Sequence, residues 1–149
     1  MSILTTLTSF EGRMRRRTFL KICLVFIVVS IAGQVLLSPS DYFTNIDVRT
    51  PFSVVLFNLI LLIPATAITV RRVNDIEWSA NWAFGLTVAA LLFYLFDYLR
   101  PFGSLGTINT GNVTVWVLLL IAAAVSLMIG FKRGTPGTNA HGPDPRVAA

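Results

Sequence analysis

The strongest constraint on this chain is a set of four apolar stretches, each close to the ~20 residues that an α-helix needs to cross a bilayer. They cover residues 18–37, 52–70, 80–99 and 113–131. All are far longer than an ordinary β-strand, and none alternates polar with apolar residues, which excludes strands. The sequence therefore predicts an all-α integral membrane protein with four transmembrane helices.

The composition agrees with this prediction and excludes several classes of protein. Of 149 residues, 54% are hydrophobic and 13% charged, whereas a soluble domain carries about 25% charged residues. A disordered chain, a disulfide scaffold and most water-soluble enzymes are thereby excluded. One His and one Cys cannot form a multi-ligand His/Cys metal site, and we find no nucleophile elbow, Walker loop or dinucleotide fingerprint. We expect no catalytic residues, no metal and no cofactor.

The basic residues predict the orientation of the chain. Of the 12 Lys and Arg residues, Arg49 and Arg100 fall on one side of the predicted spans and ten on the other. Those ten are Arg13, Arg15, Arg16, Arg17, Lys21, Arg71, Arg72, Lys132, Arg133 and Arg146. Because cytoplasmic loops are rich in Lys and Arg, both termini are predicted to be cytoplasmic. The domains are then a cytoplasmic segment (1–17), the four-helix transmembrane domain (18–131) and a cytoplasmic Gly/Pro loop and tail (132–149).

Residues 16–21 also match an export signal. Their sequence, Arg-Arg-Thr-Phe-Leu-Lys, follows the R-R-x-F-L-K pattern of twin-arginine signals. Such a signal precedes a folded cargo, whereas three further apolar stretches follow here, and no small-x-small cleavage site follows Leu37. We expect these arginines to anchor a retained first helix, with the export signal as the alternative.

Three polar motifs flank the spans, and the predicted topology places all of them on the cytoplasmic side. They are FEGRMRRRTF at residues 10–19, RRVND at residues 71–75 with SANW at residues 79–82, and GTPGTNAHGPDP at residues 134–145. In this order they resemble domain-of-unknown-function family 805. The matching residues are Phe10, Gly12, Arg13 and Arg16, then Arg71, Arg72 and Asp75, then Gly137, Asn139, Gly142, Pro143, Asp144 and Pro145.

The chain departs from the family pattern at three positions. Val73 and Asn74 replace a Leu-His pair, and His141 replaces an aromatic residue. The stretch 82–131 also holds two spans, where compact members of the family have room for about one. The resemblance implies a small protein of the bacterial inner membrane that crosses the membrane several times. It implies no biochemical activity, because the family is uncharacterised.

The first two motifs predict a binding site, and the third predicts a loop. We expect Arg13, Arg16, Arg71, Arg72 and Asp75 to lie together at the cytoplasmic ends of the first two helices. Their guanidinium groups match phosphate, which suits anionic lipid or a protein partner; the alternative is a simple topology signal with ordinary lipid contact. Five residues of the third motif are expected to form a structural loop beneath the helices rather than a flexible tail. They are Asn139, Gly142, Pro143, Asp144 and Pro145.

Together these features favour a non-enzymatic inner-membrane protein whose arginine-rich cytoplasmic face contacts anionic membrane lipids or a protein partner. A homo-oligomer is a further option. The net charge of +5 does not indicate nucleic acid, because the total charge is low and the chain is apolar. The alternative function is a small transporter or channel subunit that works as an oligomer. Asn58, inside the second span, would then line a path, whereas we expect it to join helices.

Overall fold

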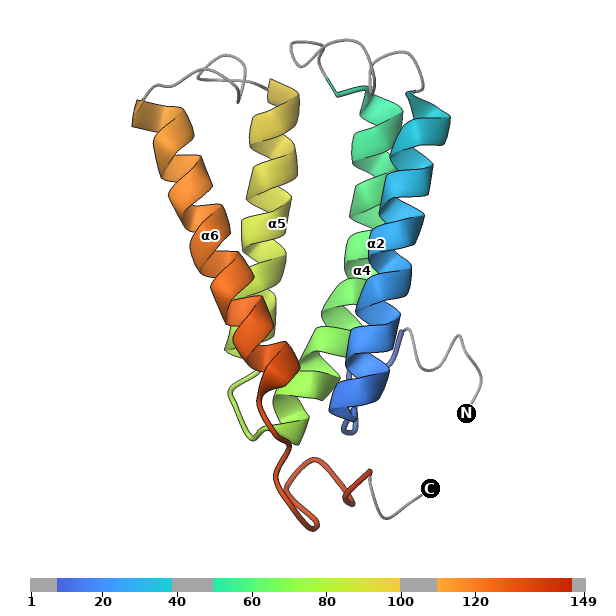
Figure 1. Ribbon diagram of the computed structural model, residues 1–149, viewed down its shortest axis with the longest axis vertical. Coiled ribbons are helices and arrows are strands. Elements are labelled where there is room, and N and C mark those ends of the chain that lie inside the picture. The colour runs from blue at the N-terminus through green and yellow to red at the C-terminus, as the bar shows by residue number, and fades with distance from the viewer. Residues whose placement is uncertain (1–7, 39–49, 100–109, 146–149) are drawn as a thin grey trace.

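The computed structural model describes residues 8–38, 50–99 and 110–145, and its regular structure consists of four long helices. They are α2 (Arg16–Leu37), α4 (Phe52–Asp75), α5 (Asn81–Leu99) and α6 (Thr110–Phe131). Successive helices run in opposite directions (Figure 1), and no strand occurs within the three described ranges. All four helices are long and apolar enough to cross a membrane. The predicted four-helix membrane fold is confirmed.

The burial pattern is that of a bundle whose outside faces lipid. Twelve residues of α4 are buried, but only Phe19 in α2 and Ala83 in α5. Large apolar side chains on the outer helices are exposed, among them Leu24, Leu92 and Leu120. Because α4 packs against both α2 and α5, it is the central helix of the bundle.

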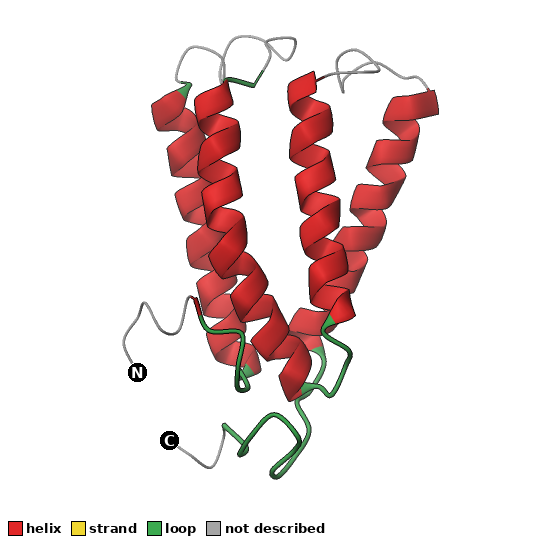
Figure 2. Ribbon diagram, turned by 180° about the vertical axis from the view of Figure 1, so that it is seen from behind, coloured by secondary structure: helices red, strands yellow, loops and turns green. Residues whose placement is uncertain are grey.

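The helices are packed closely at only one end. They converge where residues 8–15 and 132–145 lie and spread apart toward the opposite end (Figure 2). The buried apolar cluster lies at the convergent end, and Met14, Val73 and Ile129 belong to it. Basic and polar groups gather at this same end, which makes it the candidate location of a binding site. That it faces the cytoplasm stays a prediction.

Helix α4 extends five residues beyond the predicted span and ends at Asp75. The extra turn carries Arg71 and Arg72 and is buried rather than solvated. The C-cap of the helix is Ile76, whose N–H group bonds to the carbonyl of Val73, and the chain then turns at Glu77, which has a φ of 55°. Arg49, Arg100 and Arg146, which entered the orientation count, lie outside the described residues.

Candidate functional site: a buried ion-pair triad beside an open basic pocket

The last turn of α4 holds a buried ion-pair cluster, which we call the buried triad: Arg13, Arg72 and Asp75. The Asp75 carboxylate binds one guanidinium with each oxygen. Its Oδ1 accepts from Arg13 Nε at 3.0 Å and lies 3.0 Å from Arg13 Nη2, while its Oδ2 accepts from Arg72 Nη1 at 2.6 Å. The side chains of Arg13, Arg72 and Asp75 are 1%, 0% and 6% exposed. This ion pairing is therefore sheltered from water.

Backbone carbonyls bind the remaining donors of Arg13. Its Nη2 donates to the carbonyl of Thr135 at 2.5 Å, and its Nη1 donates to the carbonyl of Gly137 at 2.6 Å. A longer bond, at 3.4 Å, runs from Nη1 to the carbonyl of Gly142. Burying a guanidinium is costly unless its donors are satisfied, and here the chain that follows α6 satisfies them.

Arg72 is held in the same way by the end of α6. Its Nε donates to the carbonyl of Ile129 at 3.0 Å, and its Nη2 donates to the carbonyl of Lys132. Its Nη1 also lies 3.4 Å from the carbonyl of Met14. The buried triad therefore joins the segment before α2, the end of α4 and the end of α6.

The Gly/Pro loop docks on α4 through polar contacts of its own. The Thr135 N–H group donates to the carbonyl of Asp75 at 2.9 Å, and Asn139 Nδ2 donates to the carbonyl of Asn74 at 3.1 Å. Asn74 Nδ2 in turn donates to the carbonyl of Gly12 at 3.2 Å. Thus Asn74, where the family pattern has histidine, links the segment before α2 to the loop after α6.

The loop approaches α4 so closely that one of its positions has no room for a side chain. A Cβ atom placed on Gly134 would lie 2.0 Å from Asp75 Oδ2. Further along the loop, Gly142 has a φ of 125°, which other residues rarely adopt, and it exchanges two backbone hydrogen bonds with Asn139. Asp144 Oδ2 accepts from the N–H group of Gly137 at 3.1 Å and closes the turn.

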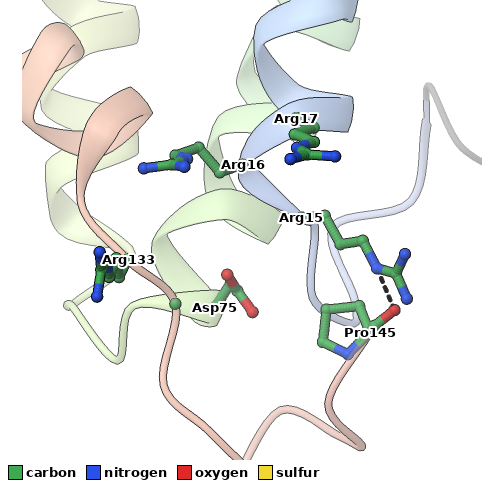
Figure 3. A pocket seen from close by; sticks show the side chains of 7 residues that line it. Arg15, Arg16, Arg17, Asp75, Arg133 and Pro145 are labelled. Atoms are coloured by element: carbon green, nitrogen blue, oxygen red, sulfur yellow. Dashed lines mark hydrogen bonds between the residues drawn. The ribbon is translucent and has the colours of Figure 1, made fainter. Parts of the chain in front are cut away.

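Beside the buried triad lies an open cavity of about 430 Å³, which we call the basic pocket. Figure 3 shows it between the first turn of α2 and the chain that follows α6, with Arg16 and Arg133 on one side of Asp75 and Arg15 on the other. Its lining residues are Arg15, Arg16, Arg17, Asp75, Arg133, Gly134 and Pro145. Among the residues that the structure describes, four arginines thus share one cavity with a single carboxylate, which the buried triad already uses.

The four pocket arginines have few bonds to the protein. Arg15 Nε donates to the carbonyl of Pro145, but Arg15 Nη2 is buried and has no hydrogen-bond partner among the described residues. Arg16 Nη1 reaches only the carbonyl of Phe131, at 3.4 Å. In the described part of the chain, no carboxylate forms an ion pair with Arg15, Arg16, Arg17 or Arg133.

The five residues of the predicted binding site fall into three environments. Arg13, Arg72 and Asp75 are together and buried. Arg71 is 8% exposed, and its carbonyl accepts from the N–H group of Met14 at 3.1 Å. Arg16 lines the basic pocket beside Asp75, and its side chain bonds to the carbonyl of Phe131 instead of joining the ion pairs. Sequence reasoning counted Arg15, Arg17 and Arg133 as topology signals only, although their clustering with Arg16 at one end was available from the predicted topology.

Asn58, in the middle of the bundle, joins three helices. Its Oδ1 accepts from Ser30 Oγ of α2 at 2.9 Å and lies 3.5 Å from the Tyr94 hydroxyl of α5, while its Nδ2 donates to the carbonyl of Val54 in α4 at 2.9 Å. These are the contacts of a polar residue that holds helices together in a bilayer.

The chain matches the family described as protein of unknown function (DUF805) over residues 7–143. It belongs to this family. The DUF805 chain is 30% identical to the uncharacterized protein YiiR of Escherichia coli K12 over 145 residues, which are 97% of this chain and 90% of that protein. It is 25% identical to the inner membrane protein YhaI of the same organism over 149 residues, which are 100% of this chain and 96% of that protein. No solved structure matches.

These relatives agree with the fold. A DUF805 chain with four helices able to span a membrane, and with a full-length relative in the inner membrane, is a multi-pass inner-membrane protein. Its family is described as one of unknown function, and the basic pocket at the convergent end is the feature that suggests a function for this chain.

Proposed function

We propose that this DUF805 chain is a non-enzymatic inner-membrane protein that binds the phosphate group of anionic lipids in the basic pocket, on the cytoplasmic face. The observation that carries the proposal is the open cavity lined by Arg15, Arg16, Arg17 and Arg133, whose charges no carboxylate among the described residues balances. A guanidinium fork matches two phosphate oxygens, and such charge-assisted bonds are about twice as strong as neutral ones.

The position of the basic pocket suits a lipid headgroup. Helix α2 begins at Arg16 and α6 ends at Phe131, so the pocket lies where two apolar spans end. The positive-inside rule favours the cytoplasmic side for this end, because ten of the 12 Lys and Arg residues fall on this side of the spans in the sequence. Anionic lipid is abundant there, and each cation near such a surface contributes about 1 kcal/mol.

The first turn of α2 adds to the attraction for anions. Its N-cap is Arg15, no side-chain hydrogen bond caps it within the described residues, and its first turn holds no acidic residue. The N-terminus of a helix carries a partial positive charge and free N–H groups, which favour a nearby anion. The helix terminus and the arginines therefore both attract an anion to the basic pocket.

The buried triad has a different part in this proposal. Arg13 and Arg72 have their donors on Asp75 and on backbone carbonyls, so they hold the walls of the pocket rather than the ligand. Asp75 fixes the loop that carries Arg133 and Gly134, because its backbone carbonyl accepts from Thr135. In this proposal Arg13, Arg72 and Asp75 support the pocket, whereas Arg16 binds the ligand.

Lipid retention tests the proposal. The wild type and the Arg16→Gln/Arg133→Gln double variant are purified in a mild detergent with phosphatidylglycerol added, and bound lipid is counted by native mass spectrometry. We expect the double variant to lose most of the lipid that the wild type retains. Lys21→Gln is the matched control, since Lys21 is exposed on α2 and does not line the pocket. Equal retention by all three proteins contradicts the proposal.

The alternative of an oligomeric transporter or channel subunit has no comparable observation in its favour. Asn58, the residue proposed for a path, binds Ser30 and the carbonyl of Val54. The basic pocket lies at the end of the bundle rather than across it.

A further inference from the structure

We infer that the basic pocket selects a phosphate monoester, a group with three unesterified oxygens, over a phosphodiester. This inference rests on the proposed function and deepens it by naming the class of ligand. Phosphatidic acid carries such a group in the membrane, and small phosphate esters carry it in solution. Most membrane phospholipids are diesters, so the distinction sets the pocket apart from general lipid contact.

The first argument is charge. Asp75 is the one carboxylate that lines the pocket within the described ranges, and its two oxygens are already bound to Arg13 and Arg72. The buried triad therefore adds one net positive charge to the four of the pocket arginines instead of neutralising them. A diester brings a single negative charge, whereas a monoester brings about 1.5 to 2 at neutral pH. The dianion offsets more of the repulsion among these arginines.

The second argument is the direction from which the donors come. Arg16 and Arg133 lie on one side of Asp75, and Arg15 lies on the other (Figure 3). A diester has two free oxygens and presents its ester carbons on the remaining sides. A monoester has three free oxygens and accepts from donors on more than one side. Arginines line the cavity on both sides of Asp75, so the third free oxygen of a monoester gives it an acceptor that a diester lacks.

The cavity also has room for more than a bare ion. Its volume of about 430 Å³ falls within the range of ~300–1,000 Å³ that is usual for small-molecule sites. It therefore accommodates the phosphate together with the first atoms of the molecule that bears it. Both a lipid and a soluble ester meet this condition, and the experiment has to separate them.

The test compares two lipids of like chains in nanodiscs of phosphatidylcholine, one containing phosphatidic acid and the other phosphatidylglycerol, with bound lipid counted by native mass spectrometry. We expect at least about tenfold preference for phosphatidic acid, the ratio that one additional strong charge-assisted bond provides. The preference should disappear in Arg16→Gln/Arg133→Gln and persist in Lys21→Gln. Arg15→Gln, which removes one of the four pocket charges and keeps the other three arginines, should reduce the preference less than the double variant does.

A second arm adds glycerol 3-phosphate to the protein loaded with phosphatidic acid. Displacement of the lipid at millimolar concentration supports the monoester chemistry and identifies a soluble source for it. No displacement together with the tenfold preference assigns the site to the lipid. Binding of glycerol 3-phosphate without any arginine-dependent lipid retention supports the monoester pocket and overturns the proposed lipid function.

The remaining outcomes separate the inference from the function on which it rests. Equal retention of the two lipids, lost in both cases in the double variant, overturns the monoester inference and leaves the proposed function standing. Retention that is the same in the wild type and the double variant, with no binding of glycerol 3-phosphate, overturns both. Thermal unfolding in detergent is measured on every variant, so that a lost preference in an unfolded protein is not counted.

Discussion

Two groups of arginines lie side by side at the convergent end of the bundle, and they are used in opposite ways. In the buried triad, Arg13 and Arg72 share one carboxylate and are bound by four or more backbone carbonyls. In the basic pocket, Arg15 and Arg16 have one carbonyl each. Arg13 and Arg15 are only two residues apart in the sequence, so the backbone around a guanidinium, and not its position along the chain, decides its role.

The two groups of arginines should also differ in how much they contribute to the free energy of unfolding. Removing one partner of a buried ion pair is strongly destabilising because the other charge stays buried and unpaired, whereas exposed charges contribute little to stability. Substitutions in the buried triad should therefore change folding, and substitutions in the basic pocket should change binding. Four experiments test this separation, beginning with the largest effect.

Asp75→Asn should produce the largest loss of stability. It leaves Arg72, whose side chain is 0% exposed, facing a neutral amide, and the expected loss is about 3–5 kcal/mol in the free energy of unfolding. Unfolding by denaturant in mixed micelles measures it. Glu77→Gln removes the same charge two residues away at an exposed position and should change stability by less than ~0.5 kcal/mol. Similar values for the two variants would remove the distinction between buried and open regions.

Arg13→Lys should cost less, although it keeps the positive charge. A lysine ammonium lacks the planar fork and cannot reach Asp75, Thr135 and Gly137 together, so we expect a loss of about 2–3 kcal/mol. The same unfolding measurement applies. Arg17→Lys, in the basic pocket, is the matched substitution and should be neutral within ~0.5 kcal/mol. A neutral Arg13→Lys would show that charge alone suffices in the buried triad.

Gly134→Ala tests the close approach of the loop to Asp75. The new Cβ would lie 2.0 Å from the carboxylate, so the loop must move, at a cost of about 1–3 kcal/mol. Gly85→Ala in α5 is the control, because its Cβ would meet nothing within 4 Å and alanine favours a helix by up to ~1 kcal/mol. We expect opposite signs for the two variants in thermal unfolding. If both are stabilising, the loop does not press on the buried triad.

Arg16→Gln/Arg133→Gln should have the smallest effect on stability. Both side chains are exposed, and the expected change is within ~0.5 kcal/mol, or slightly stabilising because repulsion among the arginines decreases. The measurement is thermal unfolding in detergent without added lipid. A loss comparable to that of Asp75→Asn would mean that the basic pocket supports the fold, and binding data from this variant would need another design.

The sequence predicted the helices of this fold but not the backbone contacts of its site, and the reasons are physical. The four spans follow from length and apolarity, which leave a chain in lipid little choice but helices. The sequence predicted that Asp75 lies with Arg71 and Arg72 but did not distinguish between the two arginines. The carbonyls of Ile129 and Lys132, at the end of α6, are what bind Arg72. The carbonyls of Thr135 and Gly137 could not be predicted, because every residue has a carbonyl and only the path of the loop selects these two.

The contact between Asp75 and the loop can form only late in the synthesis of this protein. Thr135 and Gly137 follow Asp75 by about 60 residues in the chain, which at roughly 5–20 residues per second means several seconds of synthesis. During that interval α5 and α6 are made, while Arg13 still lacks the carbonyls of Thr135 and Gly137. A chain interrupted after α6 therefore has every membrane helix, although two nitrogens of Arg13 still lack these partners. The last loop thus completes the buried triad only after every helix has been made.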